Sequence, residues 1–111
     1  MLKKILMDIG FASDKISEAE NGEDALDKIT ETHQKGSDFD FIFLDLNMPI
    51  MGGIDLLKAL DKNTNLNISS KIIIVSAESE KSTVLEALSL GASSYVNKPP
   101  KQEEVADNVS D

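Results

Sequence analysis

The sequence predicts an α/β fold with a parallel, doubly wound sheet, and two observations support this. Continuous apolar runs at Phe41–Leu44 and Ile72–Val75 are typical of strands buried on both faces. Segments with apolar residues at helical spacing lie between such runs, and this alternation implies right-handed crossovers and parallel pairing. With 111 residues, the chain is expected to form one domain, 1–111.

The remaining elements are expected from local signals. Leu2–Ile9 has helical spacing and is followed by Gly10, which favours a helix over the alternative of an opening strand. Lys15–Glu20 is a weak strand candidate, and Asn21-Gly22 is a turn. Further helices are expected at Glu23–His33, Ile54–Asp61, Ser79–Leu90 and Lys101–Val109, with strands at Phe41–Leu44, Ile72–Val75 and Ser94–Asn97.

Composition excludes several classes of function. Cysteine is absent, so the chain can form neither a disulfide framework nor a thiolate metal site. A formal net charge of −9 opposes non-specific binding to nucleic acid and docking on anionic membranes. No apolar run is long enough to span a bilayer, and the start of the chain does not resemble a signal peptide. We therefore expect a cytoplasmic protein.

Polar residues follow three predicted strands in the same way. Asp45 follows the first apolar run, Ser76 the second, and Lys98 comes directly after Ser94–Asn97. The carboxyl ends of parallel strands share one edge, where open α/β sheets bind their ligands. A carboxylate can attack phosphorus, a hydroxyl can donate to a phosphoryl oxygen, and an ammonium can offset phosphate charge. The three residues therefore predict a site for phosphoryl transfer.

Beyond this constellation, the chain resembles the receiver domain of bacterial two-component response regulators, especially the stand-alone chemotaxis type. The resemblance implies a flavodoxin-like fold. It rests on stretches that follow the family's order over nearly the whole chain: Glu-Ala-Glu-Asn-Gly-Glu-Asp-Ala-Leu (18–26), Leu-Asp-Leu-Asn-Met-Pro (44–49), Ser-Ala (76–77), Leu-Gly-Ala-Ser-Ser-Tyr (90–95) and Lys-Pro (98–99).

The resemblance implies a role for each matching residue. Asp45 would accept phosphate from a histidine kinase or a phosphotransfer protein, and Ser76 would be the hydroxyl that moves toward it. Lys98 would be the active-site lysine, and Tyr95 the aromatic that changes rotamer as a downstream protein target is recognised. Mg²⁺ would be held by Asp45 and the backbone carbonyl of Asn47. The peptide bond between Lys98 and Pro99 is expected to be cis, as is common in the family.

The chain also departs from the family pattern. A complete receiver opens with a strand that ends in acidic residues, and those acids hold the Mg²⁺. The stretch 9–19 is too short for a strand-to-helix crossover if Lys4–Asp8 were that strand. We therefore interpret the chain as a receiver domain that is truncated at the first strand and in the last helix. We expect it to bind Mg²⁺ weakly or not at all and to be phosphorylated slowly or not at all.

Loss of a central strand would leave strand edges unpaired, and unpaired edges invite pairing with another chain. We therefore expect self-association, as a homodimer or a domain-swapped oligomer. Light scattering over a dilution series checks this, and a compact monomer at every concentration would contradict it.

Other interpretations remain open at this point. The chain could be a degenerate receiver that binds proteins without phosphate. Asp45 could merely cap a strand, and Tyr95 could simply pack at a sheet edge. A haloacid-dehalogenase type of enzyme also places an Asp nucleophile after a buried strand, but it has a second Asp two residues later, where this chain has Asn47. Apart from self-phosphorylation and dephosphorylation, no enzymatic activity is expected.

Overall fold

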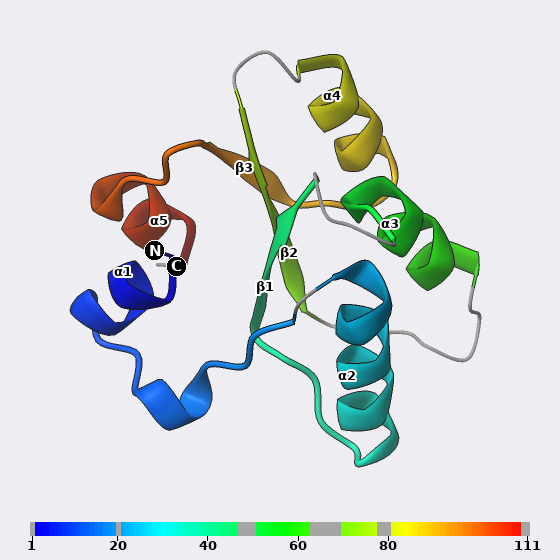
Figure 1. Ribbon diagram of the computed structural model, residues 1–111, viewed down its shortest axis with the longest axis horizontal. Helices are drawn as coiled ribbons and strands as arrows, with labels where there is room; N and C mark the ends of the chain where they lie inside the picture. The colour runs from blue at the N-terminus through cyan, green and yellow to red at the C-terminus, as the bar shows by residue number, and fades with distance from the viewer. Residues whose placement is uncertain (1, 20, 47–50, 63–69, 78–80, 110–111) are drawn as a thin grey trace.

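A computed structural model describes residues 2–19, 21–46, 51–62, 70–77 and 81–109. It has a central sheet with helices on both faces (Figure 1). In chain order the elements are α1 (Leu2–Asp8), the 3₁₀ helix η1 (Ser13–Lys15), α2 (Gly22–Gln34), β1 (Phe41–Asp45), α3 (Gly53–Lys62), β2 (Lys71–Ser76), α4 (Lys81–Ser89), β3 (Ser94–Asn97) and α5 (Gln102–Val109).

The sheet has three parallel strands in the order β1-β2-β3. Ile42 pairs in register with Ile72, and Ile73 with Ser94. Successive strands are joined through α3 and through α4, as crossover connections between parallel strands require. The α/β fold class predicted from the apolar runs is therefore confirmed.

Two apolar clusters cover the two faces of the sheet. On one face, Ile73, Val96 and Val105 are completely buried, and side chains of α1 and of β1 pack against them. The other face holds the larger cluster, to which α3, α4 and α2 contribute (Figure 1). β1 supplies both clusters, with Phe41 and Phe43 on the first face and Ile42 and Leu44 on the second. Contacts on both faces account for the continuous apolar sequence of this strand, although only Leu44 is fully buried and residues 41–43 are partly exposed, which corrects the expectation of a fully buried strand.

The expectation of a strand at Lys15–Glu20 is wrong for the residues that the structure describes. Ser13–Lys15 forms η1, and residues 16–19 join no strand ladder, while Glu20 lies outside the described residues. The backbone at Ile16 is extended, with φ −110° and ψ 119°. A strand is stable only when its backbone groups are paired, and a groove separates this segment from β1. The segment is therefore strand-like in conformation but unpaired.

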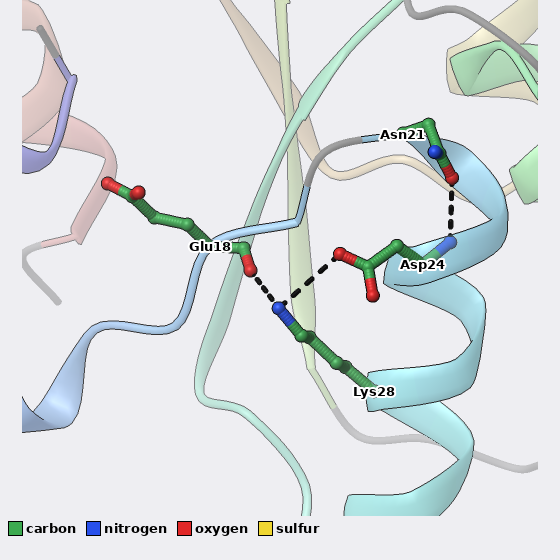
Figure 2. Close-up of polar contacts among 4 residues, drawn as sticks. All are labelled: Glu18, Asn21, Asp24 and Lys28. Carbon is green, nitrogen blue, oxygen red and sulfur yellow. Dashed lines mark hydrogen bonds and ion pairs between the residues drawn. The ribbon is translucent and has the colours of Figure 1, made fainter.

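The helix expected at Leu2–Ile9 is confirmed as α1, and Gly10 follows it with a positive φ of 119°. The helix expected from Glu23 begins one residue earlier, at Gly22. Asn21 caps it, because its side-chain oxygen accepts a hydrogen bond of 2.8 Å from the backbone N–H of Asp24 (Figure 2). The start expected for α4, Ser79, lies outside the described residues.

Polar contacts attach the last turn of α5 to the amino ends of two strands. The ammonium of Lys71 donates to the backbone carbonyl of Asn108 over 2.8 Å. The hydroxyl of Ser94 donates to the side-chain oxygen of Asn108, whose amide nitrogen donates to the carbonyl of Glu104. Lys71 begins β2 and Ser94 begins β3. The carboxyl end of α5 is therefore held at the amino ends of the strands, and the predicted site lies at their carboxyl ends.

Candidate functional site

The carboxyl edge of the sheet brings together the side chains expected to form the site. Asp45 is the last residue of β1, Ser76 the last of β2, and Lys98 follows β3 directly. The ammonium of Lys98 donates to Asp45 Oδ1 over 2.8 Å, although the two residues lie 53 positions apart. The expected convergence of Asp45 and Lys98 at one edge of the sheet is therefore present, and the two side chains also form an ion pair.

Backbone pairing fixes the position of Lys98 relative to Ser76. Ser76 lies opposite Asn97 in the register of β2 and β3, and Asp45 lies opposite Val75 in the register of β1 and β2. One residue further on, the N–H of Lys98 donates to the carbonyl of Ser76 over 2.8 Å. The sheet itself thus places Ser76 one register position beyond Asp45 and directly beside Lys98.

Ser76 is the buried polar member of the site. Only 1% of its surface is exposed, and among the residues that the structure describes its hydroxyl has no hydrogen-bond partner. A buried, unsatisfied polar group costs about 1–3 kcal/mol. Ser76 is not among the residues that line the pocket of Asp45 and Lys98, so the structure brings it to the same edge of the sheet without placing its hydroxyl in that pocket.

Asp45 and Lys98 also line a pocket of about 460 Å³. Their side chains are 40% and 34% exposed, so both remain accessible from solvent. The peptide bond between Lys98 and Pro99 is cis, as expected. The other lining residues are Leu2, Phe43, Val75, Pro99 and Pro100. The sequence pattern identified the charged residues but not this apolar lining, to which α1 contributes Leu2.

Tyr95 lies in the middle of β3, opposite Ile74, and 47% of its surface is exposed. It is not among the residues that line the pocket beside Asp45. A change of rotamer and a role in partner recognition both remain predictions for this residue.

The described residues do not form a complete magnesium site. Asn47, whose carbonyl was expected to bind Mg²⁺, lies outside the described part of the chain. Within that part, no three acidic or histidine side chains are grouped closely enough to hold a metal ion. Asp45 supplies one carboxylate, which already pairs with an ammonium, whereas Mg²⁺ demands near-octahedral oxygen ligation. Asp45 could supply one carboxylate ligand to a bound Mg²⁺ ion, and the contribution of Asn47 stays a prediction.

Gly53 lies close to the backbone of Asp45 and Leu46. The sequence analysis did not identify this residue. A Cβ atom at this position would lie 2.9 Å from the backbone oxygen of Asp45 and 2.9 Å from Cα of Leu46. We expect Gly53→Ala to lower the free energy of unfolding by about 1–3 kcal/mol, because backbone atoms must move to admit the methyl group. Urea denaturation followed by circular dichroism measures this.

The neighbouring glycine provides a matched control. Among the described residues, a Cβ at Gly52 would meet only the carbonyl oxygen of Leu46, at 3.4 Å, which is an ordinary contact. We expect Gly52→Ala to change the unfolding free energy by no more than about 0.5 kcal/mol. Equal effects of the two substitutions would show that Gly53 is not a close-packing position.

No helix within the described ranges has the length and apolar character needed to cross a bilayer.

Similar sequences and similar solved structures both belong to response regulators. The family model described as the response regulator receiver domain matches residues 1–110. Chemotaxis protein CheY-3 of Vibrio cholerae is 35% identical over 99 residues, which cover 89% of this chain and 70% of that protein. Chemotaxis protein CheY of Pseudomonas aeruginosa is also 35% identical over 99 residues, covering 89% of this chain and 73% of the relative.

Solved structures of similar proteins have the same fold. CheY4 of Vibrio cholerae superposes with a TM-score of 0.76 at 26% identity, covering 98% of this chain and 83% of the other. A chain from a CheX–CheY–BeF₃–Mg²⁺ complex of Borrelia burgdorferi superposes with a TM-score of 0.79 at 28% identity, covering 97% and 75%.

Proposed function

Because this chain belongs to the family of response regulator receiver domains, we propose that Asp45 accepts a phosphoryl group from a histidine kinase or a phosphotransfer protein. The observation that carries the proposal is the 2.8 Å contact between Asp45 and Lys98 at the carboxyl edge of the sheet, where Ser76 ends the neighbouring strand. A nucleophile, a fixed positive charge and a hydrogen-bond donor are the parts that phosphoryl transfer requires from a protein.

The proposed step exchanges one bond to phosphorus for another. A carboxylate oxygen of Asp45 attacks the phosphorus of a phosphohistidine, and the P–O bond forms as the P–N bond breaks. The imidazole nitrogen leaves with the electron pair of that bond. The product is an acyl phosphate on Asp45, and phosphoryl groups carry close to two negative charges at neutral pH.

Lys98 and Ser76 would bind this new charge. The ammonium that now contacts Asp45 Oδ1 is placed to follow the charge onto the phosphoryl oxygens. Ser76 would donate its hydroxyl hydrogen to a phosphoryl oxygen and so gain the acceptor that it lacks among the described residues. Its movement toward that oxygen is the conformational signal that we propose.

The signal would be read on the surface formed by α4, β3 and α5. Exposed apolar side chains on these elements are Leu85 of α4, which is 67% exposed, and Tyr95 of β3, which is 47% exposed. Exposed aromatic and aliphatic side chains of this kind are typical anchors in protein interfaces. We propose that a downstream protein binds there and that Tyr95 changes rotamer as Ser76 moves.

A second function is favoured by how few metal ligands the described residues bring together. Among the described residues no three acidic or histidine side chains are grouped closely enough to hold a metal ion, so on this alternative the chain would bind a divalent ion weakly. On this alternative the chain is a degenerate receiver that binds its partners without phosphate. Whether Asp45 becomes phosphorylated at all distinguishes the two functions.

The test is incubation of the chain with acetyl phosphate and excess Mg²⁺, followed by intact mass spectrometry. We expect slow addition of a single phosphoryl group, which hydroxylamine removes because it cleaves acyl phosphates but not phosphoserine. Absence of any addition, also with a histidine kinase as the donor, would support the degenerate receiver. A hydroxylamine-resistant product would contradict modification at a carboxylate.

A further inference from the structure

The first residue of α2 lies against the segment that leads from Asp45 to α3. The backbone N–H of Gly22 donates to the carbonyl of Met51 over 3.0 Å. A Cβ atom at Gly22 would overlap that carbonyl oxygen and would lie 2.9 Å from the carbonyl carbon and from Cβ of Met51. Because real Cβ atoms essentially never come so close, a side chain at this position would push Met51 away from α2.

The need for room, and not the backbone conformation, accounts for glycine at the start of α2. Gly22 is buried, and among the described residues the glycines with a positive φ are Gly10, Gly36 and Gly91. Glycine is a poorer helix former than alanine. The chain therefore has a less favourable helix residue at the point where α2 touches Met51.

The same segment also returns to the backbone of Asp45. Met51 is followed by two glycines, and the N–H of the second, Gly53, donates to the carbonyl of Leu46 over 3.3 Å. A Cβ at Gly53 would lie 2.9 Å from the backbone oxygen of Asp45. The short segment that begins at Met51 therefore contacts α2 at one end and the backbone of Asp45 at the other.

The first turn of α2 is fastened by contacts of its own. The side chain of Asn21 caps it through the N–H of Asp24, and the ammonium of Lys28 lies between a carboxylate oxygen of Asp24 and the carbonyl of Glu18 (Figure 2). Further along the helix, the side chain of Ile29 is buried in the core. The helix is therefore a firm support against which the segment can be held.

We propose that Gly22 is a positioning residue for the acceptor side chain. Its lack of a Cβ lets α2 hold Met51, and this contact fixes the path of the backbone that presents Asp45 to Lys98. The inference rests on the proposed role of Asp45 in phosphoryl transfer. Gly22 is not among the residues that line the pocket of Asp45, so it acts through the backbone and does not touch the phosphoryl donor.

The first test is the rate of phosphoryl addition to Gly22→Ala, measured with acetyl phosphate and excess Mg²⁺ by intact mass spectrometry. Met51 must move to admit the methyl group, and a displacement of about 1 Å in a reacting geometry can cost about 10²-fold in rate. We expect a maximal rate about tenfold lower than that of the unmodified chain. The acetyl phosphate concentration that gives half the maximal rate is expected to stay the same.

Gly36→Ala is the stability control. Gly36 has a φ of 84°, at which alanine is strained, and among the described residues nothing lies within 4 Å of a Cβ built there. It is exposed and precedes β1, at the end of the strand opposite Asp45. We expect this variant to unfold at a lower urea concentration but to be phosphorylated at the rate of the unmodified chain. Equal losses of rate in the two variants, or no loss in Gly22→Ala, would overturn the proposal.

A pair of variants at Asn21 loosens the same turn without adding an atom at the contact. Asn21→Ala removes the oxygen that caps the helix, whereas Asn21→Ser keeps one. We expect Asn21→Ala to slow phosphoryl addition about twofold or more and Asn21→Ser to restore the rate. This pair decides the proposal if Gly22→Ala does not fold, because equal rates for Asn21→Ala and Asn21→Ser would then overturn it.

A second measurement does not depend on phosphoryl transfer. In ¹H–¹⁵N NMR spectra we expect Gly22→Ala to shift the amide resonances of Leu46 and Gly53, which are joined beside Asp45, and Gly36→Ala to leave both unchanged. Unchanged resonances in Gly22→Ala would overturn the positioning role. If the unmodified chain accepts no phosphoryl group, the function proposed for Asp45 fails, and these resonances still decide whether Gly22 holds the segment.

Discussion

Asp45→Asn is expected to abolish addition of the phosphoryl group completely. An amide oxygen is a poor nucleophile toward phosphorus, and the variant removes the carboxylate that Lys98 contacts at 2.8 Å. The side chain is 40% exposed, and ion pairs of such exposure contribute about 0–1 kcal/mol, so the fold is expected to persist. Intact mass spectrometry after prolonged incubation with acetyl phosphate measures the loss, and circular dichroism confirms the fold.

Asp40→Asn is the matched control for this variant. Asp40 is an exposed carboxylate immediately before β1, at the opposite end of the same strand from Asp45. The exchange of acid for amide is identical, and we expect the rate of phosphoryl addition to remain unchanged. Retention of the phosphoryl group by Asp45→Asn would mean that another residue is the acceptor and would refute the proposed function.

Lys98→Met is expected to slow phosphoryl addition by about 10²–10³-fold, the usual cost of removing one preorganised donor from a site where charge develops. Methionine preserves much of the apolar length of the lysine but cannot neutralise phosphoryl charge. The lysine is 34% exposed, so its removal should change the unfolding free energy by no more than about 1 kcal/mol. A large kinetic effect with a small effect on stability is the expected signature of this residue.

Two further variants make the Lys98 result specific. Lys101→Met removes an exposed lysine three positions away, outside the pocket, and should leave the rate unchanged. Lys98→Arg retains the charge in a planar, differently shaped group and should restore only part of the rate. If Lys98→Met and Lys101→Met reduce the rate equally, the effect is general electrostatics rather than direct contact with the phosphoryl group.

The parallel sheet and the meeting of Asp45 with Lys98 could both be predicted because each depends on strong local signals. Continuous β-branched and aromatic runs allow few alternatives to a buried strand. Once strands are parallel, residues that follow them must share an edge, whatever their separation in sequence. The placement of Lys98 and Asp45 at one edge follows from this topology, whereas their direct 2.8 Å contact is a finding of the structure.

Other features depend on tertiary context and could not be read from the residues alone. Lys15–Glu20 has a weakly strand-like sequence, but pairing depends on a neighbouring strand, which the described residues do not provide at this position. The close approach of Gly53 to the Asp45 carbonyl depends on where α3 begins. A glycine pair after a strand indicates a turn, but it does not reveal which of the two glycines is tightly packed.

The attachment of α5 has a mechanical consequence for the proposed transfer of a phosphoryl group to Asp45. Its last turn is fastened to Lys71 and Ser94 through Asn108, whereas its first turn follows Lys98 through two prolines whose φ angles are fixed. A pull on Lys98 from charge gained at Asp45 would therefore move the near end of the helix while the far end acts as a pivot. The eight residues of α5 span roughly 12 Å. Added negative charge at Asp45 would therefore tilt this helix and the surface that it forms with β3.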